Sequence, residues 1–368
     1  MDRALRLTFA LGISFWLLTG ATTASRNSVT RAAAERTKLL PHFKPGDVYR
    51  YQVDLRTSTV SQSTGPIADP QGSSKLDRVV TATVRLEVLK VEAEANHSGQ
   101  RIRLRTTYEQ SSAKSKSDSY DPQEDEIEKQ YKNLEGHSLE FTLEADGTVT
   151  EIEGLKDIMS DESAAGAVRE WLTSMTAGSS LPKQGIAIGE KWSTEKPIDG
   201  APLAGLAWRT ESTYLRNEPC FPGKNADKSA DSSASADPAH AVKPQANSHS
   251  KPKSSSPPSS TVSSQEGCAM ILTKFEMVDR HGSGDPTPLS YSRNSLRTAG
   301  KWTGTGESLT TISLRTGMVV SLTQTGSEDI DFTISAATTP SKIHYAGKIQ
   351  TQSHISLEPS SPADSPRR

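Results

Sequence analysis

The sequence predicts a mainly β protein made of two related antiparallel sheets, arranged as a sandwich or half-barrel, with one or two short covering helices. Three observations predict this class. Apolar and polar side chains alternate over segments of six or more residues, which is typical of half-buried strands. Turn signals separate these segments, and the clearest is Asp146-Gly147. Apolar residues make up 33% of the 368 residues, and they concentrate in the alternating segments.

The N-terminus predicts a cleaved export signal over residues 1–25. An apolar run, Leu7–Leu18, follows two arginines and precedes small polar residues, with a cleavage point expected near Ala24. A run of about a dozen residues fits a signal sequence, whereas a membrane span needs about 20. A buried first helix is the alternative. Position 21 is Ala21, not the cysteine of a lipoprotein signal, so we expect a secreted or periplasmic protein whose residues 26–41 form a flexible segment.

The net charge of −2 is close to balanced and gives no reason to expect a nucleic acid or a membrane surface as partner. No stretch after the N-terminal run is apolar enough to span a bilayer. We therefore expect no membrane span in the mature chain.

Three alternating segments open the body of the protein. They are Val48–Thr57, Val79–Val91 and Arg101–Glu109, and each places its apolar residues on one face. Tyr49, Tyr51, Val53, Leu55, Val80, Ala82, Val84, Leu86, Val88, Ile102, Leu104 and Tyr108 are the side chains expected on the buried face.

Two helices and a hairpin are expected next. Asp121–Gly136 begins with a capping Asp and a Pro and ends at a Gly, as a short helix does. Ser138–Ile152 reads as a tight hairpin. Ser160–Met175 carries apolar residues at helical spacing, with Trp171 among them. We expect this second helix to cover one face of a sheet, with Trp171 as a core anchor and not a ligand platform.

The second half of the chain resembles the first. The tetrapeptide at Gly46–Tyr49 has an echo at Gly189–Trp192, and the hairpin pattern recurs at Ser308–Leu322. The matching order favours a duplicated β unit, with halves over 42–180 and 181–357. Coincidence stays open, because amphipathic hairpins resemble one another. Gly205–Leu215, Ala269–Met277 and Ile343–Leu357 are the further strands expected in the second half.

A tract rich in Ser, Ala, Pro and Lys, residues 224–266, interrupts this half. It cannot bury enough apolar area to offset an ordering entropy of about 1–2 kcal/mol per residue. Because strands end near Leu215 and begin near Ala269, the tract is predicted to be a disordered loop inserted between antiparallel neighbours. The β-rich body then runs over 42–357 as one unit, followed by a disordered tail at 358–368.

Cys220 and Cys268 bracket this tract and are the two cysteines of the chain. In an exported protein, two cysteines at the base of one loop are well placed to form a disulfide. Two free thiols or a metal pair are the rivals. A metal site needs about four ligands, and His240 and His249 lie in the tract without a spacing motif.

No motif of catalysis or cofactor binding appears in the sequence. The eight histidines form no zinc-protease pair, and no nucleophile elbow, phosphate loop or dinucleotide-binding glycine pattern is present. The acidic run Glu124–Glu128 lies at a predicted helix start, where carboxylates are favoured by the helix dipole. We therefore predict no catalytic residue, no cofactor and no metal. A catalytic site assembled only in space stays open, because one sequence can hide it.

Three segments resemble an uncharacterised family of exported bacterial β-rich proteins, a domain of unknown function. They are Phe43–Tyr51, Leu134–Gly154 and Leu181–Trp192. These motifs are turns, strand starts and aromatic anchors. The resemblance implies export and a β-rich body, and it brings no catalytic residues. The missing lipoprotein cysteine departs from many exported relatives and puts surface anchoring in doubt.

The leading functional hypothesis is an exported, non-enzymatic β protein that acts as a binding or envelope-associated module. The first alternative is a carrier of an apolar ligand or lipid in a groove between curved sheets, and the second is a hydrolase with a hidden site. Core positions are the competing interpretation of the groove aromatics, since one face of every sheet must be buried. Tyr49, Tyr51, Trp192, Trp208 and Trp302 are the residues expected to line the groove.

Overall fold

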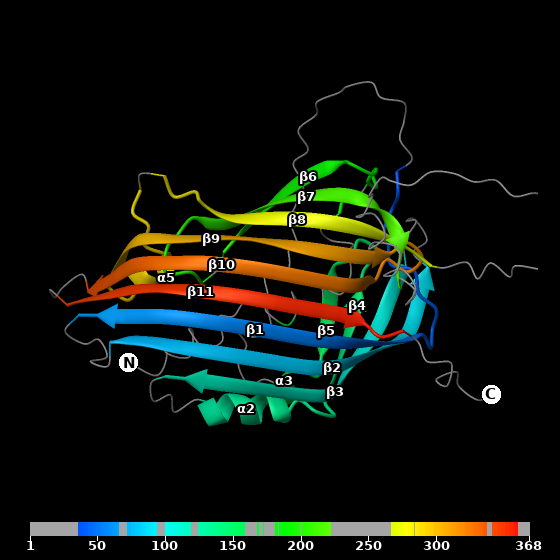
Figure 1. The fold of residues 1–368 in the computed structure, drawn as a ribbon, viewed down its shortest axis with the longest axis horizontal. Helices are drawn as coiled ribbons and strands as arrows, with labels where there is room; N and C mark the ends of the chain where they lie inside the picture. The colour runs from blue at the N-terminus through cyan, green and yellow to red at the C-terminus, as the bar shows by residue number, and fades with distance from the viewer. Residues whose placement is uncertain are drawn as a thin grey trace, which may run out of the picture.

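In the computed structural model, eleven strands form a single antiparallel sheet (Figure 1). The structure describes residues 36–65, 72–93, 100–118, 124–158, 168, 172, 181–182, 184–198, 200–221, 266–282, 284–336 and 341–359. The predicted signal sequence, the insert up to residue 265 and the tail from residue 360 lie outside these ranges.

The strands follow the segments in which apolar and polar residues alternate. In the first half they are β1 Val48–Thr64, β2 Ser73–Ala93, β3 Gln100–Ser117, β4 Ser138–Leu143 and β5 Val149–Glu153. In the second half they are β6 Lys191–Pro197, β7 Leu206–Pro219, β8 Gly267–Asp279, β9 Leu296–Ser313, β10 Val319–Ala336 and β11 Lys342–Leu357. The helices described are short: α2 Glu124–Lys132, α3 Leu155–Ile158 and α5 Leu289–Ser292.

The strand order is β5-β4-β3-β2-β1-β11-β10-β9-β8-β7-β6. Each half is a meander, and β11 joins the halves because it pairs with β1 on one side and β10 on the other. Val53 and Leu322 lie on either side of Ile355 in this register. A mainly β fold is thus confirmed, but two separate sheets are not. The long closing strand β11 pairs with β1, the first strand of the chain, and so joins the two halves into one sheet.

The two halves begin with the same turn. Gly46 and Gly189 both have positive φ, at 86° and 82°, and each precedes an acidic residue that closes the turn. This acidic residue accepts from the backbone N–H three residues earlier, as a turn-capping carboxylate does. The two bonds are Lys44 N–H to Asp47 Oδ2 at 3.0 Å and Ala187 N–H to Glu190 Oε2 at 2.8 Å.

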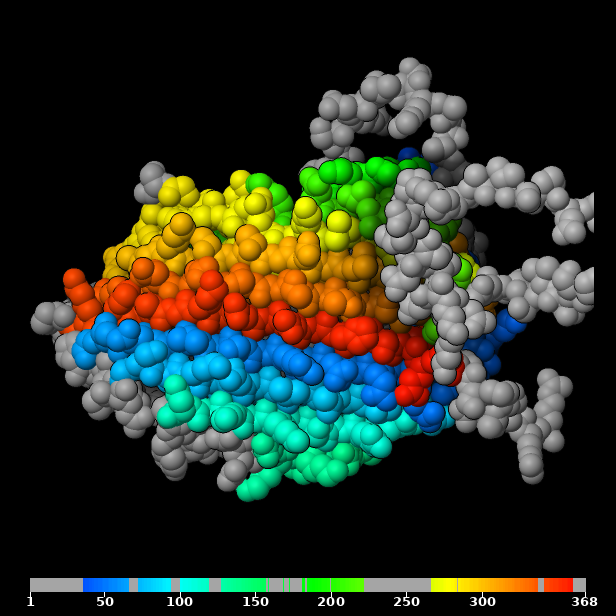
Figure 2. Space-filling model, viewed as in Figure 1, coloured from blue at the N-terminus to red at the C-terminus, as the bar shows by residue number. Residues whose placement is uncertain are grey.

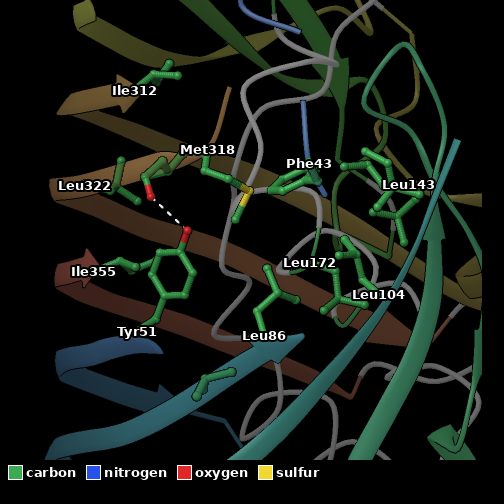
Figure 3. Close-up of a cluster of buried hydrophobic side chains, with 14 of the residues drawn as sticks. Phe43, Tyr51, Leu86, Leu104, Leu143, Leu172, Ile312, Met318, Leu322 and Ile355 are labelled. Carbon is green, nitrogen blue, oxygen red and sulfur yellow. Dashed lines mark hydrogen bonds between the residues drawn. The ribbon is translucent and has the colours of Figure 1, made fainter. Parts of the chain in front are cut away.

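One face of the sheet is curved around a main core (Figure 3). Strands far apart in the sheet contribute to it: Leu104 of β3 and Phe141 of β4 belong to the same buried cluster as Ile271 of β8 and Leu322 of β10. A flat sheet would keep these strands apart, so the shared core requires the sheet to curl. The predicted buried residues of β1 and β2, from Tyr51 to Val88, lie on this inner face.

Two segments outside the sheet complete the main core. The chain passes from β5 at one edge to β6 at the other, and on this path Val168 and Leu172 are helical and buried. They belong to the predicted second helix, whose Trp171 lies outside the described residues. The segment 26–41, expected to be flexible, is described from residue 36 onward. There Thr37 bridges to Ile186, and Leu39 is packed in the core.

Helix α2 protects the part of β3 that extends beyond β4. The Glu135 carboxylate accepts from the Ser111 backbone N–H at 3.1 Å, and Ile127 packs into a small cluster on this side. Unpaired strand edges invite association with other chains, and a covering helix prevents this. The predicted helix over Asp121–Gly136 is therefore present, although its capping Asp lies outside the described residues.

The opposite face of the sheet is polar and charged. Cross-strand ion pairs run over it, such as Lys348 with Asp329 and Arg209 with Glu276. Figure 2 shows side chains of β7–β11 and β1–β3 closing this face into a continuous surface. Exposed pairs of this kind contribute at most about 1 kcal/mol each, so the inner face supplies most of the stability.

The predicted disulfide is present. Cys220 and Cys268 are bonded, with their Cα atoms 4.9 Å apart and a sequence separation of 48. The strands beside them, β7 and β8, pair antiparallel from Leu206–Asp279 to Pro219–Gly267, as expected from the position of the insert. The disulfide therefore links the two strands at the loop end of this hairpin, where the insert begins and ends.

Candidate functional site

The structure divides the five predicted groove aromatics into two groups. Tyr51 is fully buried, and Tyr49 and Trp192 pack against the same main core. The Tyr51 hydroxyl donates to the Val319 carbonyl at 3.0 Å and Tyr49 donates to Asp47. Burial raises the pKa of Tyr51 well above its ordinary value. These three residues anchor the core at the end of the sheet where β1 begins.

Trp208 and Trp302 lie farther along the inner face, on β7 and β9. Residues directly opposite each other in paired strands share a face. By this rule Trp208 faces inward beside Met277, and Trp302 faces inward beside Ile330. Glu328 faces inward as well, between Gly304 and Ile349. We call the side chains of Trp208, Phe275, Met277, Trp302, Glu328 and Ile349 the inner floor.

Glycines make room for the aromatic rings of the inner floor. A Cβ atom on Gly304 would stand 2.6 Å from the Trp208 ring and 3.2 Å from Glu328 Cγ. A Cβ on Gly306 would stand 2.3 Å from the Phe275 ring. Glycine within a strand marks a close approach of this kind. The rings therefore lie across neighbouring strands, and Trp208 and Phe275 meet edge to face with centroids 5.5 Å apart.

The inner floor is only partly covered. Trp208 is buried, whereas Phe275, Met277, Trp302, Glu328 and Ile349 are half-buried. Large apolar side chains on the inner side of a curved sheet, with part of their surface accessible, are a candidate ligand surface.

Glu328 is the chemically distinctive residue of this surface. The Trp302 indole N–H donates to Glu328 Oε2 at 2.9 Å. Burial among apolar side chains raises the pKa of this carboxyl, and the Trp302 hydrogen bond lowers it by a smaller amount. The neighbours of Glu328 across the strands are a glycine and an isoleucine, which explains why desolvation dominates.

Removing this charge is expected to stabilise the protein. The pKa of Glu328 is higher in the folded chain than in the unfolded chain. At pH values between these two pKa values the folded state binds more protons than the unfolded state, so the free energy of unfolding falls as the pH rises from the lower pKa to the higher one. Glu328→Gln keeps an oxygen for Trp302 but cannot ionise. Its advantage over the parent protein should appear at pH 7 and shrink below the ordinary pKa of Glu. Urea unfolding at both pH values measures this, and an unchanged difference between them would contradict it.

A band of hydroxyl groups separates the inner floor from the main core. Thr194 and Thr210 share a hydrogen bond at 2.7 Å, and Ser212 shares one with Thr273 at 2.8 Å. On β1 and β3, outside this band, the pattern changes. Within the described part of the chain, the buried hydroxyls of Thr57, Thr106, Ser111 and Ser115 have no protein partner. Such groups cost about 1–3 kcal/mol when nothing satisfies them, so these four hydroxyls are suited to contact with water or a polar group.

Glu328 and Phe275 are not among the site residues predicted from the sequence. The signal for Glu328 is present in the alternation of β10, where Ile330, Phe332 and Ile334 are buried. Extending this alternation two residues back from Ile330 places the Glu328 carboxylate on the buried face, where an acidic side chain without a partner is unusual. Phe275 lies on the same face of β8, opposite Gly306 of β9. The partners of these residues could not be read without the strand order.

No metal centre is outlined by the described residues, since nowhere among them do three or more His, Cys, Asp or Glu side chains gather. The described helices also include none with the length and apolar character to cross a bilayer.

No protein-family model and no curated protein matches the chain. Solved structures give weak similarity. A protein assigned as a lipoprotein from Parabacteroides distasonis has a TM-score of 0.23 and 9% identity, over 88% of this chain and 98% of that one. DynF from the dynemicin biosynthesis pathway of Micromonospora chersina has a TM-score of 0.17 and 6% identity, over 95% and 99%. The outer membrane protein OprG from Pseudomonas aeruginosa has a TM-score of 0.16 and 7% identity, over 86% and 98%. At such TM-scores the similarity supports no conclusion about function.

Proposed function

We propose that this protein is an exported, non-enzymatic binding protein that holds a ligand with an apolar body on the inner floor of its curved sheet. The observation that carries the proposal is the accessibility of Phe275, Met277, Trp302 and Ile349 on the inner face. Met277, Trp302 and Ile349 border a second buried cluster that includes Leu206, Ile330 and Phe332, and they keep part of their surface accessible beside it.

The composition of the inner face supports small-ligand binding over a protein interface. Ligand sites are concave and mostly apolar, with a few polar groups that fix orientation. The inner floor has this composition, with Glu328 as its polar group and the hydroxyl pairs of β6–β8 beside it.

Export is part of the proposal. The apolar run Leu7–Leu18 supports a signal sequence, and the bond between Cys220 and Cys268 is typical of an oxidising compartment. We also propose membership of the uncharacterised exported β-rich family, and descent of the two halves from one duplicated unit. The two matching turns at Gly46 and Gly189 support the duplication.

Two measurements test ligand binding. The first is solvent extraction of protein purified from an exporting host, followed by mass spectrometry, which should recover an apolar compound in stoichiometric amount. The second is a titration with N-phenyl-1-naphthylamine, a neutral apolar dye whose fluorescence rises in apolar sites. Ile349→Asn places a polar group on the inner floor and should weaken dye binding about tenfold, which corresponds to about 1.4 kcal/mol.

Gln350→Asn is the matched control, because the neighbouring side chain points to the opposite, exposed face. It should bind the dye like the parent protein. An empty extract together with no dye binding by the parent protein would refute the proposed function. Activity in a broad hydrolase screen, lost on substitution of a hydroxyl residue, would favour the enzymatic alternative instead.

A further inference from the structure

The charge of the ligand follows from the surroundings of Glu328, and this inference rests on the proposed function. Oε2 of Glu328 accepts from Trp302. Among the residues that the structure describes, its other oxygen has no hydrogen-bond partner, and no basic side chain lies in salt-bridge distance of either oxygen. One oxygen of this half-buried carboxylate is therefore left without a protein partner among these residues.

The acidic residues beside Glu328 on the same strand are paired. Asp329 lies 3.6 Å from Lys348, and Asp331 lies 2.7 Å from His344, both on the opposite face of the sheet. Glu328 faces inward between Gly304 and Ile349, neither of which can supply a positive charge. A half-buried carboxylate is costly without a cation, because the surrounding apolar groups do not solvate it.

Aromatic residues lie near this carboxylate on the same face of the sheet. Trp302 is hydrogen-bonded to it. The Trp208 ring and Glu328 Cγ both lie over Gly304, where a Cβ atom would stand 2.6 Å from the ring and 3.2 Å from Cγ. Phe275 adds a ring that contacts Trp208 edge to face. A carboxylate beside several aromatic rings is the combination that attracts an organic cation, since the rings present their negative faces to the charge.

We propose that the inner floor binds an organic ammonium ion carried on an apolar body, with the ammonium group at Glu328 and the apolar body along Phe275, Met277 and Ile349. The ammonium group neutralises the carboxylate, and the apolar body covers the half-buried side chains. A ligand with a carboxylate head is disfavoured at this position by repulsion from Glu328.

Calorimetric titration with three probes of equal chain length tests the charge preference. The probes are octyltrimethylammonium, octan-1-ol and octanoate, at one ionic strength and neutral pH. The parent protein should bind the ammonium probe at least tenfold more tightly than the alcohol, and octanoate more weakly than either. Glu328→Gln should lose at least tenfold in affinity for the ammonium probe and keep its affinity for octan-1-ol.

Glu307→Gln is the matched control, because it removes an exposed carboxylate from the opposite face of the neighbouring strand β9. It should leave all three affinities unchanged. Equal affinity for the three probes, an unaffected Glu328→Gln variant, or an equal loss in Glu307→Gln would overturn the ammonium site. If the naphthylamine dye still binds in that case, the proposed function stands. If neither the dye nor any octyl probe binds, both fail.

Discussion

Replacing Cys220 and Cys268 together by alanine is expected to lower the free energy of unfolding by about 4 kcal/mol. The disulfide closes a loop with a sequence separation of 48, and in the chain-entropy model a loop of this length gives a contribution of about this size. Cys268 is fully buried and Cys220 nearly so, which adds packing between β7, β8 and β10 to the effect. Urea unfolding monitored by tryptophan fluorescence measures the change.

Reduction provides the control for this prediction. Dithiothreitol should destabilise the parent protein by a similar amount and leave the double alanine variant unchanged. The two experiments remove the same covalent bond, but only the substitution also removes the sulfur atoms. A loss below about 1 kcal/mol in both would show that the paired strands hold the hairpin end without the disulfide, and would contradict the entropic argument.

Leu172→Ala is expected to destabilise the protein by about 2–5 kcal/mol. The Leu172 side chain is fully buried in the main core, near Leu104 (Figure 3). Removing it costs the transfer free energy of the lost methyl groups and leaves a cavity. The residue belongs to the segment that connects β5 at one sheet edge with β6 at the other, so its loss loosens the connection as well as the core.

Leu289→Ala is the matched control, because the same substitution is made at a leucine that is 74% exposed. It should change the free energy of unfolding by less than about 0.5 kcal/mol. Equal effects of the two substitutions would mean that the connecting segment does not pack into the core as described. Thermal and urea unfolding of both variants would settle this.

Much of the fold could be predicted because strand patterns are local. The alternation of apolar and polar residues that predicts Tyr51, Val53 and Leu86 on the buried face is present within each segment by itself. The hairpin at Asp146-Gly147 and the pairing of β7 with β8 likewise depend on neighbours in sequence. The number of sheets could not be predicted in this way. It depends on the pairing of β1 with β11, which are separated by nearly the whole chain.

The candidate site was predicted in part. Trp208 and Trp302 lie together on the inner floor, whereas Tyr49, Tyr51 and Trp192 belong to the main core. An aromatic residue on an alternating strand is expected to face inward in either case. Whether it meets a packed core or an accessible surface depends on which strands lie beside it and on what covers that part of the sheet.

The sequence by itself determined the class of fold, the inward residues of most strands and the pairing of Cys220 with Cys268. The fold class and the inward residues follow from a period of two residues and from turns between adjacent segments, and the disulfide follows from two cysteines at the base of one inserted tract. Only the tertiary structure decided that the two halves share one sheet. It also decided that Glu328 lies beside Trp302 and that no basic side chain among the described residues pairs with it. The physical reason is that contacts across a sheet form between strands distant in sequence, and local patterns specify which face a side chain takes but not its neighbour.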